Sequence, residues 1–188
     1  AYTEVCQQMG VACSAKHFPG DGRDERDQHL CTTVNDFSVE EWKATYGRIY
    51  RRLIDEGVKT VMVGHIMQPA CSRALDGALK DADILPATLS KELLSGLLRQ
   101  ELKFNGLIIT DATTMAGFDA AMPRDEAVPR AVAAGCDMFL FTKNLDEDYA
   151  FMKRGVEKGI ITRERLDEAV WRLSLIHISE PTRLRCIS

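Results

Sequence analysis

Four short apolar runs recur along this chain, and segments with helical periodicity lie between them. The runs cover residues 11–15, 60–64, 107–110 and 138–142. Short runs rich in β-branched or aromatic residues are typical of strands that are buried on both faces. Because buried strands that alternate with helices build a parallel sheet, the order of these segments predicts an α/β fold.

The helical segment over residues 38–56 has the clearest ends. Ser38 followed by Glu41 makes a capping box at its start, and Gly57 ends the segment. The expected apolar face consists of Trp42, Tyr46, Ile49, Tyr50, Leu53 and Ile54.

Further helices are expected over residues 90–102, over residues 124–134 before Gly135, and after an N-cap at Thr162. The positions expected to be buried on the first and the last of these are Leu93, Leu94, Leu97, Leu98, Leu166, Ala169, Val170 and Leu173.

Size and composition exclude several classes of protein. With 188 residues and 45% hydrophobic content, the chain can form one compact domain, which excludes a fibre and a disulfide-stapled miniprotein. The 24 basic and 28 acidic residues give a net charge of −4 without any basic block, so we expect no nucleic-acid partner. No apolar stretch is long enough for a membrane span. The 6 cysteines lack Cys-x-x-Cys spacing, which favours a reducing, cytoplasmic location.

Both ends of the chain depart from this pattern. The first residue is Ala1, and the residues after it resemble the end of a helix already under way, so we expect a fragment. Residues 173–188 lose the helical face, and the string LSLIHISEPTR resembles a translated sequencing adapter. We therefore predict a native domain over residues 1–172 and a non-native or disordered tail over 173–188, where His177 and Cys186 have no function. A genuine irregular C-terminus is the alternative.

Chemically active side chains stand where the predicted strands end. Lys16 and His17 follow the first run, His65 follows the second, and Asp111 follows the third. In parallel α/β folds the functional residues sit at the carboxyl ends of the strands. We therefore expect these side chains along one edge of the sheet.

The segment KHFPGDGRDERDQH, residues 16–29, holds the densest set of charges. Asp27 and His29 are two positions apart in a loop and can turn toward each other, so that the carboxylate orients and charges the imidazole as a general acid. A solvated acidic loop with an incidental histidine is the alternative, and spacing alone favours it.

The same segment also contains side chains that could bind a metal ion. His17, Asp21, Asp27 and His29 are all possible ligands, but no zinc spacing matches, and Lys16 would repel a cation. We expect neither a metal nor another cofactor.

The sequence contexts of His65 and Asp111 predict different roles for the two residues. A histidine in the sequence GHIM is more often hydrogen-bonded inside the rim of a barrel than catalytic. Asp111 follows LIIT at a strand end, where a carboxylate faces a pocket. One such carboxylate and a separate acid on a loop are the groups of a retaining glycosidase. An N-cap role for Asp111 is equally compatible with the sequence.

A family resemblance bears on these alternatives. The segments AKHFPGDG, DQH, GHIM, LIITDATTM, AGCDMFLF and ITRERLDEAVWRL, in this order, resemble the family 3 glycoside hydrolases over residues 1–172. The branch is that of the β-N-acetylglucosaminidases, or β-N-acetylhexosaminidases, whose signature is close to KHFPGHGxxxxDSH. The resemblance implies a (β/α)8 barrel, a TIM barrel, of which this chain holds an incomplete part, roughly strands five to eight.

The resemblance also implies roles for residues. Asp111 resembles the nucleophile of the family, His29 its acid/base on a mobile loop, and Asp27 the carboxylate partner of that histidine. Lys16 and His17 match the pair that binds the hydroxyls of the sugar.

One further binding candidate and two departures accompany these roles. His65 is a further candidate for substrate binding. Asp21 stands where the family usually has histidine, and Gln28 stands where it has serine, which leaves the substrate preference open.

The implied function is a retaining exo-glycoside hydrolase. It would remove terminal β-linked N-acetylglucosamine from cell-wall or chitin-derived sugars, with carbohydrate as its partner, and the fragment alone would be inactive. A β-glucosidase of the same fold and a non-catalytic sugar-binding remnant are the alternatives. Phosphorolysis is a variant, because a neutral histidine acid tolerates an incoming phosphate better than a carboxylate does.

Overall fold

A parallel sheet forms the centre of the molecule, as the sequence predicts. The structure is a computed structural model and describes residues 2–179. The order in the 4-stranded sheet is β1-β3-β5-β6, and every neighbouring pair is parallel. The bounds of these strands are Ser14–Phe18 for β1, Thr60–Val63 for β3, Leu107–Ala112 for β5 and Met138–Leu140 for β6. A second, 2-stranded parallel sheet pairs β2 (Thr33–Val34) with β4 (Ile66–Met67).

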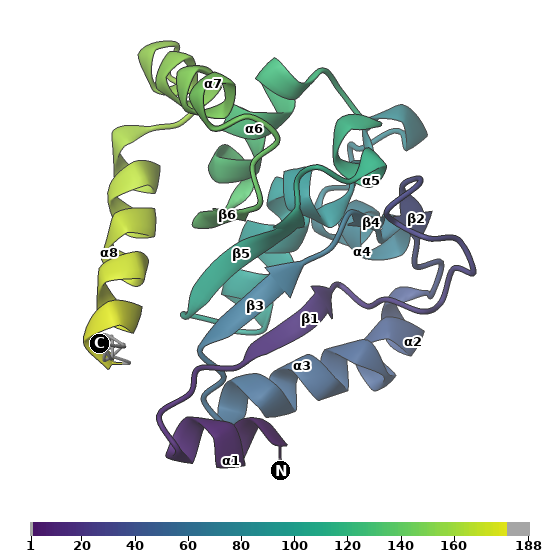
Figure 1. Cartoon of the computed structure of the whole chain (residues 1–188). Helices are drawn as coiled ribbons and strands as arrows, with labels where there is room; N and C mark the ends of the chain where they lie inside the picture. The colour runs from purple at the N-terminus through teal and green to yellow at the C-terminus, as the bar shows by residue number, and fades with distance from the viewer. Residues whose placement is uncertain (1, 180–188) are drawn as a thin grey trace.

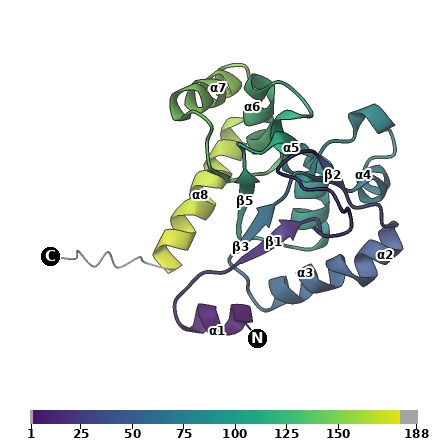
Figure 2. The ribbon, with the colours of Figure 1, turned by 45° about the vertical axis from the view of Figure 1, so that its right-hand side comes forward.

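Helices flank the main sheet. Figures 1 and 2 show α2 and α3 alongside β1 at one end of the sheet, and α6, α7 and α8 at the other end. The α-helices are α1 (Tyr2–Gln8), α2 (Val39–Ala44), α3 (Tyr46–Asp55), α4 (Pro69–Leu75), α5 (Ala116–Asp119), α6 (Arg124–Ala134), α7 (Leu145–Glu157) and α8 (Arg163–Ser179). Two 3₁₀ turns and a π-helix complete the chain: η1 (Asp81–Asp83), η2 (Ala87–Leu89) and η3 (Glu92–Glu101).

The first strand lies later in the sequence than its apolar run predicts. It begins at Ser14 and ends at Phe18, so Lys16 and His17 lie inside β1 and do not follow it. Exposure alternates along this strand until Phe18 is fully buried. The predicted run over residues 11–15 therefore overlaps β1 only at Ser14 and Ala15, because the exposed positions of the strand carry polar side chains and leave it without a continuous apolar run.

The predicted helix over residues 38–56 is two helices. The capping box of Ser38 and Glu41 is confirmed, but the chain breaks between α2 and α3 at Thr45 (φ −111°, ψ −93°). Trp42 explains the break: it is buried, its Nε1 donates to the Pro19 carbonyl at 2.7 Å, and a Cβ on Gly47 would lie 2.8 Å from its ring.

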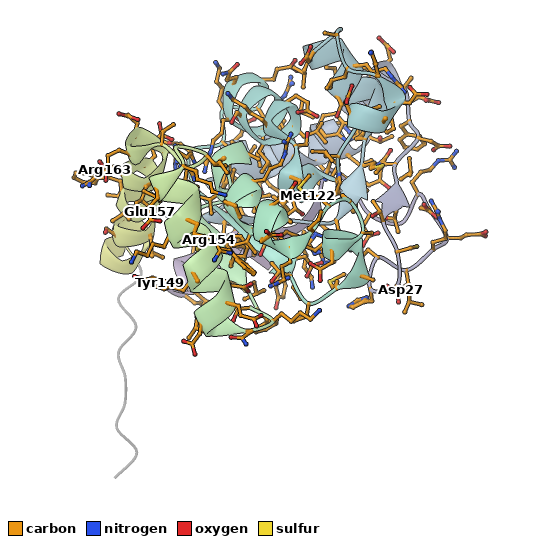
Figure 3. The ribbon with its side chains drawn as sticks, turned by 90° about the horizontal axis from the view of Figure 1, so that it is seen from above. Asp27, Met122, Tyr149, Arg154, Glu157 and Arg163 are labelled. Carbon is orange, nitrogen blue, oxygen red and sulfur yellow. The ribbon has the colours of Figure 1, made fainter. Side chains whose placement is uncertain are left out.

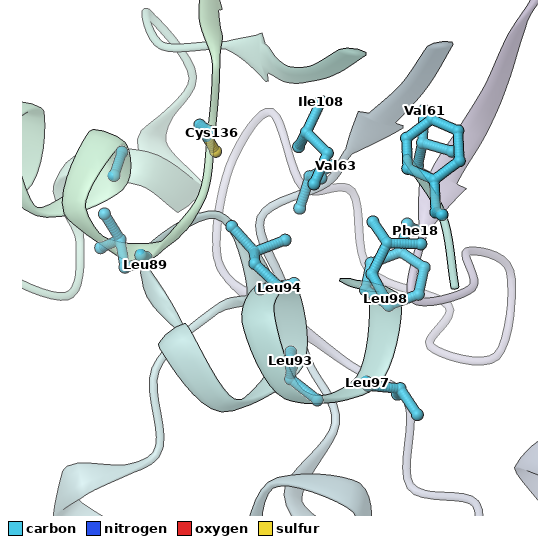
Figure 4. Packing of buried hydrophobic residues seen from close by; sticks show 14 of the residues in the cluster. Phe18, Val61, Val63, Leu89, Leu93, Leu94, Leu97, Leu98, Ile108 and Cys136 are labelled. Carbon is cyan, nitrogen blue, oxygen red and sulfur yellow. The ribbon is translucent and has the colours of Figure 1, made fainter. Parts of the chain in front are cut away.

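Most of the predicted apolar faces are confirmed. On α3, Tyr50 is buried, whereas Ile49 is 55% exposed and does not belong to the core. The leucines of η3 are all buried, and Figure 4 shows Leu94 and Leu98 on the side of η3 that faces Val63, Ile108 and Phe18. The main core therefore lies between this helix and the sheet.

The last helix begins where the sequence predicts and continues further than expected. Thr162 Oγ1 accepts from the backbone N of Arg165 at 3.2 Å, which confirms the N-cap. Val170 is 54% exposed, so it is not buried as predicted. The helix α8 runs to Ser179, so the first part of the predicted tail is helical, while residues 180–188 with Cys186 lie outside the described residues. Between residues 2 and 179, no helix is long and apolar enough to cross a membrane.

A buried ion cluster ties α8 to the sheet, and no local pattern of residues predicts it. The Asp137 carboxylate is completely buried; it accepts from Arg99 Nη2 at 2.6 Å and from the backbone N of Ile108 at 2.9 Å. Arg165 also donates to this carboxylate, and Arg172 Nη1 lies 3.3 Å from it. Burial lowers the pKa of the Arg99 guanidinium to about 10, and Asp137 opposes that shift.

We expect Asp137→Ala to lower the free energy of unfolding by about 3 kcal/mol, because it leaves buried guanidinium groups without their counter-charge. Asp167→Ala is the matched control: Asp167 pairs with Arg163 at 3.0 Å on the exposed side of α8, where an ion pair contributes little. Urea unfolding of both variants beside the parent protein, at concentrations where light scattering shows no association, measures the difference. Equal effects of the two substitutions would contradict the account.

Candidate active site

The strand ends bring His17 and Asp111 together. His17 Nε2 lies 3.4 Å from Asp111 Oδ2, and His17 Nδ1 lies 3.1 Å from Asp21 Oδ2. The order of the sheet explains the contact, because β1 and β5 flank β3 on its two sides and end at the same edge. The expected gathering of side chains at this edge is confirmed for His17 and Asp111.

Asp111 is held in place and still partly accessible. It lies within β5, and its Oδ1 accepts from the backbone N of Ala112 at 2.8 Å. Its side chain is 14% exposed. The next helix, α5, begins only at Ala116, so the alternative that Asp111 caps a helix is wrong. A fixed carboxylate with one oxygen near an imidazole can attack an electrophilic carbon.

Asp27 and His29 form the predicted pair. His29 Nδ1 lies 2.6 Å from Asp27 Oδ1, and the backbone N of His29 donates to the same oxygen at 2.9 Å. These bonds, the backbone one first, lower the pKa of the Asp27 carboxyl. Because an ionised carboxylate only accepts, His29 Nδ1 must be the donor, and this fixes the orientation of the ring.

The pair sits on an exposed loop. The side chains of Asp27 and His29 are 58% and 69% exposed, and Figure 3 shows Asp27 at the edge of the molecule, far from Arg163. Among the residues whose side chains the structure describes, none makes a hydrogen bond to His29 Nε2, so this atom can exchange a proton with a bound molecule.

The other charges of this loop hold its shape. Asp24 Oδ2 accepts from the backbone N of Val34 at 2.9 Å and from Arg26 Nη2 at 2.5 Å, and these partners, chiefly Arg26, hold the pKa of the Asp24 carboxyl well below its usual range. Arg23 Nε donates to Asp36 Oδ1 at 2.6 Å. These bonds fix the conformation of this exposed loop.

His65 lies beneath the site and not in it. The ring is completely buried: Nε2 donates to the Ala112 carbonyl at 3.1 Å, and Nδ1 lies 2.9 Å from Thr88 Oγ1. Burial lowers the pKa of His65 and favours the neutral ring. The prediction that His65 binds substrate is not supported by this burial; the ring supports the strand that carries Asp111.

Lys16 and Gln28 complete the surroundings. Lys16 is exposed in β1, beside His17, and no ion pair joins it to another described residue. Gln28 lies between Asp27 and His29 in the sequence and is buried. Neither its polar side chain nor the spacing of the loop predicts this burial. Within residues 2–179, no group of three or more His, Cys, Asp or Glu side chains is arranged to hold a metal ion.

Comparison with protein families and curated proteins identifies relatives of this chain. The model of the glycosyl hydrolase family 3 N terminal domain matches residues 1–176. A β-N-acetylglucosaminidase/β-glucosidase of Cellulomonas fimi is 60% identical over 178 residues, which are 95% of this chain and 32% of that protein. A β-hexosaminidase of Methylobacillus flagellatus is 32% identical over 73% of this chain and 36% of its own length. The chain thus spans about a third of the length of these relatives.

Solved structures share the fold. The β-glucoside phosphorylase BglX bound to 2FGlc is 49% identical, with a TM-score of 0.91 over 93% of this chain and 31% of that one. A glycoside hydrolase family 3 β-N-acetylglucosaminidase from Paenibacillus sp. is 31% identical, with a TM-score of 0.84 over 95% of this chain and 33% of that one. The parallel sheet and its helices therefore match part of a (β/α)8 barrel domain.

Proposed function

The chain belongs to family 3 of the glycosyl hydrolases, and from this premise we propose that it carries the reacting groups of a retaining β-N-acetylhexosaminidase. Its substrates would be cell-wall or chitin-derived sugars with a terminal β-linked N-acetylglucosamine. The observation that supports this most is the separation of roles: Asp111 is fixed at the end of β5, while His29 is oriented by Asp27 on an exposed loop.

The proposed reaction has two steps. Asp111 attacks the anomeric carbon and forms an ester, while the bond from that carbon to the departing oxygen breaks and His29 gives this oxygen a proton. Water then transfers a proton to the neutral His29 and adds its oxygen to the anomeric carbon, which releases Asp111 as a carboxylate. Two displacements at one carbon retain the β configuration.

Neighbouring side chains have supporting roles in this proposal. Asp27 stays ionised because its pKa is lowered, so it stabilises the charge of His29 before the first proton transfer. His17 lies next to Asp111, so it can bind a sugar hydroxyl while Asp111 attacks. The family resemblance assigns Lys16 to the same hydroxyls, and its side chain is exposed.

A β-glucoside substrate is the second candidate, with phosphate in place of water as a variant. The Cellulomonas fimi relative is named for both N-acetylglucosaminides and glucosides, and BglX is named a β-glucoside phosphorylase. Aryl β-N-acetylglucosaminides and aryl β-glucosides, each assayed with and without inorganic phosphate, separate these possibilities. A free β-anomer as the first product indicates hydrolysis, and a sugar 1-phosphate indicates phosphorolysis. No turnover of any of them would favour the sugar-binding remnant.

These tests need a complete barrel. We define the completed enzyme as a chimera in which residues 1–172 of this chain replace the matching segment of the Cellulomonas fimi relative. The 60% identity between the two makes this exchange conservative.

By itself, the 188-residue chain is expected to be inactive and to self-associate. In the described part, β1 and β6 pair on one side only, and Phe141 and Leu145 are exposed near the open edge at β6. Open edges and uncovered apolar side chains promote association between chains. Light scattering and turnover of an aryl N-acetylglucosaminide, with the completed enzyme as the active control, check this. A monomeric, active chain would contradict it.

A further inference from the structure

Gln28 is buried although both of its neighbours are exposed. Only 5% of the residue is accessible, against side-chain exposures of 58% for Asp27 and 69% for His29. Both ends of its amide are bonded: Nε2 donates to Asp21 Oδ2 at 3.1 Å, and Oε1 accepts from the backbone N of His65 at 3.0 Å. Its side chain therefore points into the protein from the middle of the loop that carries the pair.

Two glycines leave the space that Gln28 occupies. A Cβ on Gly64 would lie 3.0 Å from Gln28 Oε1, and a Cβ on Gly117 would lie 2.9 Å from the Gln28 carbonyl oxygen. These glycines come from different segments, one after β3 and one in α5. The fit to both shows a dedicated site for this side chain and its backbone.

Two sets of hydrogen bonds, one through the Gln28 amide and one through the His29 carbonyl, tie the loop to the strand ends near Asp111. Asp21 Oδ2, which accepts from Gln28, also lies 3.1 Å from His17 Nδ1, and His17 in turn contacts Asp111. In addition, the carbonyl of His29 accepts from the backbone N of Ala116 at 3.2 Å, shortly after β5 ends. The exposed loop is thus tied to the strand ends on both sides of the site.

We propose that Gln28 is a positioning residue, whose amide anchors the loop so that His29 stays in place relative to Asp111. The inference rests on the proposed function. An exposed loop has many accessible conformations, and proton transfer to a departing oxygen requires one of them. A shift of about 1 Å in such a group can lower the rate by about 100-fold.

The variant Gln28→Glu tests the anchor with little change in volume. Its carboxylate still accepts from the backbone N of His65, but it replaces the amide donor and faces the carboxylate of Asp21. In the double variant Asp21→Asn/Gln28→Glu, the new amide at position 21 donates to the carboxylate at position 28. The bond between the two positions returns with donor and acceptor exchanged.

Gln7→Glu is the matched control. The Gln7 amide also bridges two groups, because Nε2 donates to the Gly57 carbonyl at 3.0 Å and Oε1 accepts from the backbone N of Lys59 at 3.1 Å. This bridge joins α1 to the start of β3, at the opposite end of the sheet from the loop. A general effect of removing a bridging amide would appear here as well.

The readout is kcat/KM of the completed enzyme for a series of aryl N-acetylglucosaminides. For poor leaving groups, we expect Gln28→Glu to lower kcat/KM by about 10-fold to 100-fold, with a loss that shrinks as the leaving group becomes more acidic. Because Asp21 Oδ2 also contacts His17 Nδ1, the double variant is compared with Asp21→Asn alone, and in that background Gln28→Glu should cause little further loss. Gln7→Glu should show no dependence on the leaving group. Should Gln28→Glu not fold by circular dichroism, Gln28→Asn, which is too short to reach both partners, should show the same dependence.

A loss that is uniform across the series, or no loss at all, would overturn the proposal. A loss from Gln28→Glu that is as large in the Asp21→Asn background as in the parent would also overturn it. The variant His29→Ala, measured on the same series, separates this failure from failure of the proposed function. If His29→Ala shows the leaving-group dependence and Gln28→Glu does not, only the role of Gln28 is wrong.

Discussion

Asp111→Ala is expected to lower kcat of the completed enzyme by roughly 10⁴-fold or more while the fold stays intact. The substitution removes the group that forms the covalent bond to the anomeric carbon. It disturbs little else, since the Asp111 side chain is partly accessible and bonds to the neighbouring backbone N of Ala112. Steady-state kinetics and circular dichroism of the variant measure the two parts of this prediction.

Asp167→Ala is the control for this experiment, because Asp167 is an exposed carboxylate that pairs with Arg163 on α8, away from the reacting groups. Its kcat should stay close to that of the parent. Sodium azide added to Asp111→Ala with an activated substrate should give the α-glycosyl azide, the product of one displacement instead of two. Activity of Asp111→Ala within about tenfold of the parent would show that the nucleophile is another residue.

His29→Ala is expected to lower kcat/KM by roughly 10³-fold for substrates with poor leaving groups. The penalty should shrink for activated aryl leaving groups, because these depart with little proton donation. Asp27→Ala should act in the same direction but more weakly, since it removes only the group that orients and charges the imidazole. A series of aryl N-acetylglucosaminides of graded acidity measures both variants.

Azide provides a second readout for His29. With an activated substrate, it should raise kcat of His29→Ala and give the β-glycosyl azide, because Asp111 still forms the ester that azide then displaces. A uniform loss across the aryl series would mean that His29 binds sugar and donates no proton. No loss would leave the loop without a part in the reaction.

Local signals were enough to predict much of the fold. The capping box of Ser38 and Glu41 and the buried leucines of η3 depend on residues a few positions apart, and both are confirmed. The break at Thr45 was not predictable in this way. It depends on how Trp42 packs against Gly47 and Pro19, and Pro19 lies far from the helix in sequence.

The candidate site also contains one contact that local spacing predicts and others that depend on the tertiary fold. Asp27 and His29 are two positions apart, so their contact followed from spacing. The contact of His17 with Asp111 became specific only once the order of the strands was known. In the sequence, Gln28 is only a departure from the family pattern. Its hydrogen-bond partners, Asp21 and the backbone of His65, come close to it only in the folded protein.

The most direct test of the account is to trap the covalent intermediate and locate it. The completed enzyme is incubated with an activated 5-fluoro-β-N-acetylglucosaminide, whose fluorine slows release of the sugar, and its intact mass and peptide map are measured. We expect one added 5-fluoro-N-acetylglucosaminyl group, on the peptide that contains Asp111, and none on Asp111→Ala. A label on a different carboxylate would contradict the assignment of Asp111. A complete lack of label in an enzyme that turns over substrate would contradict the covalent mechanism itself.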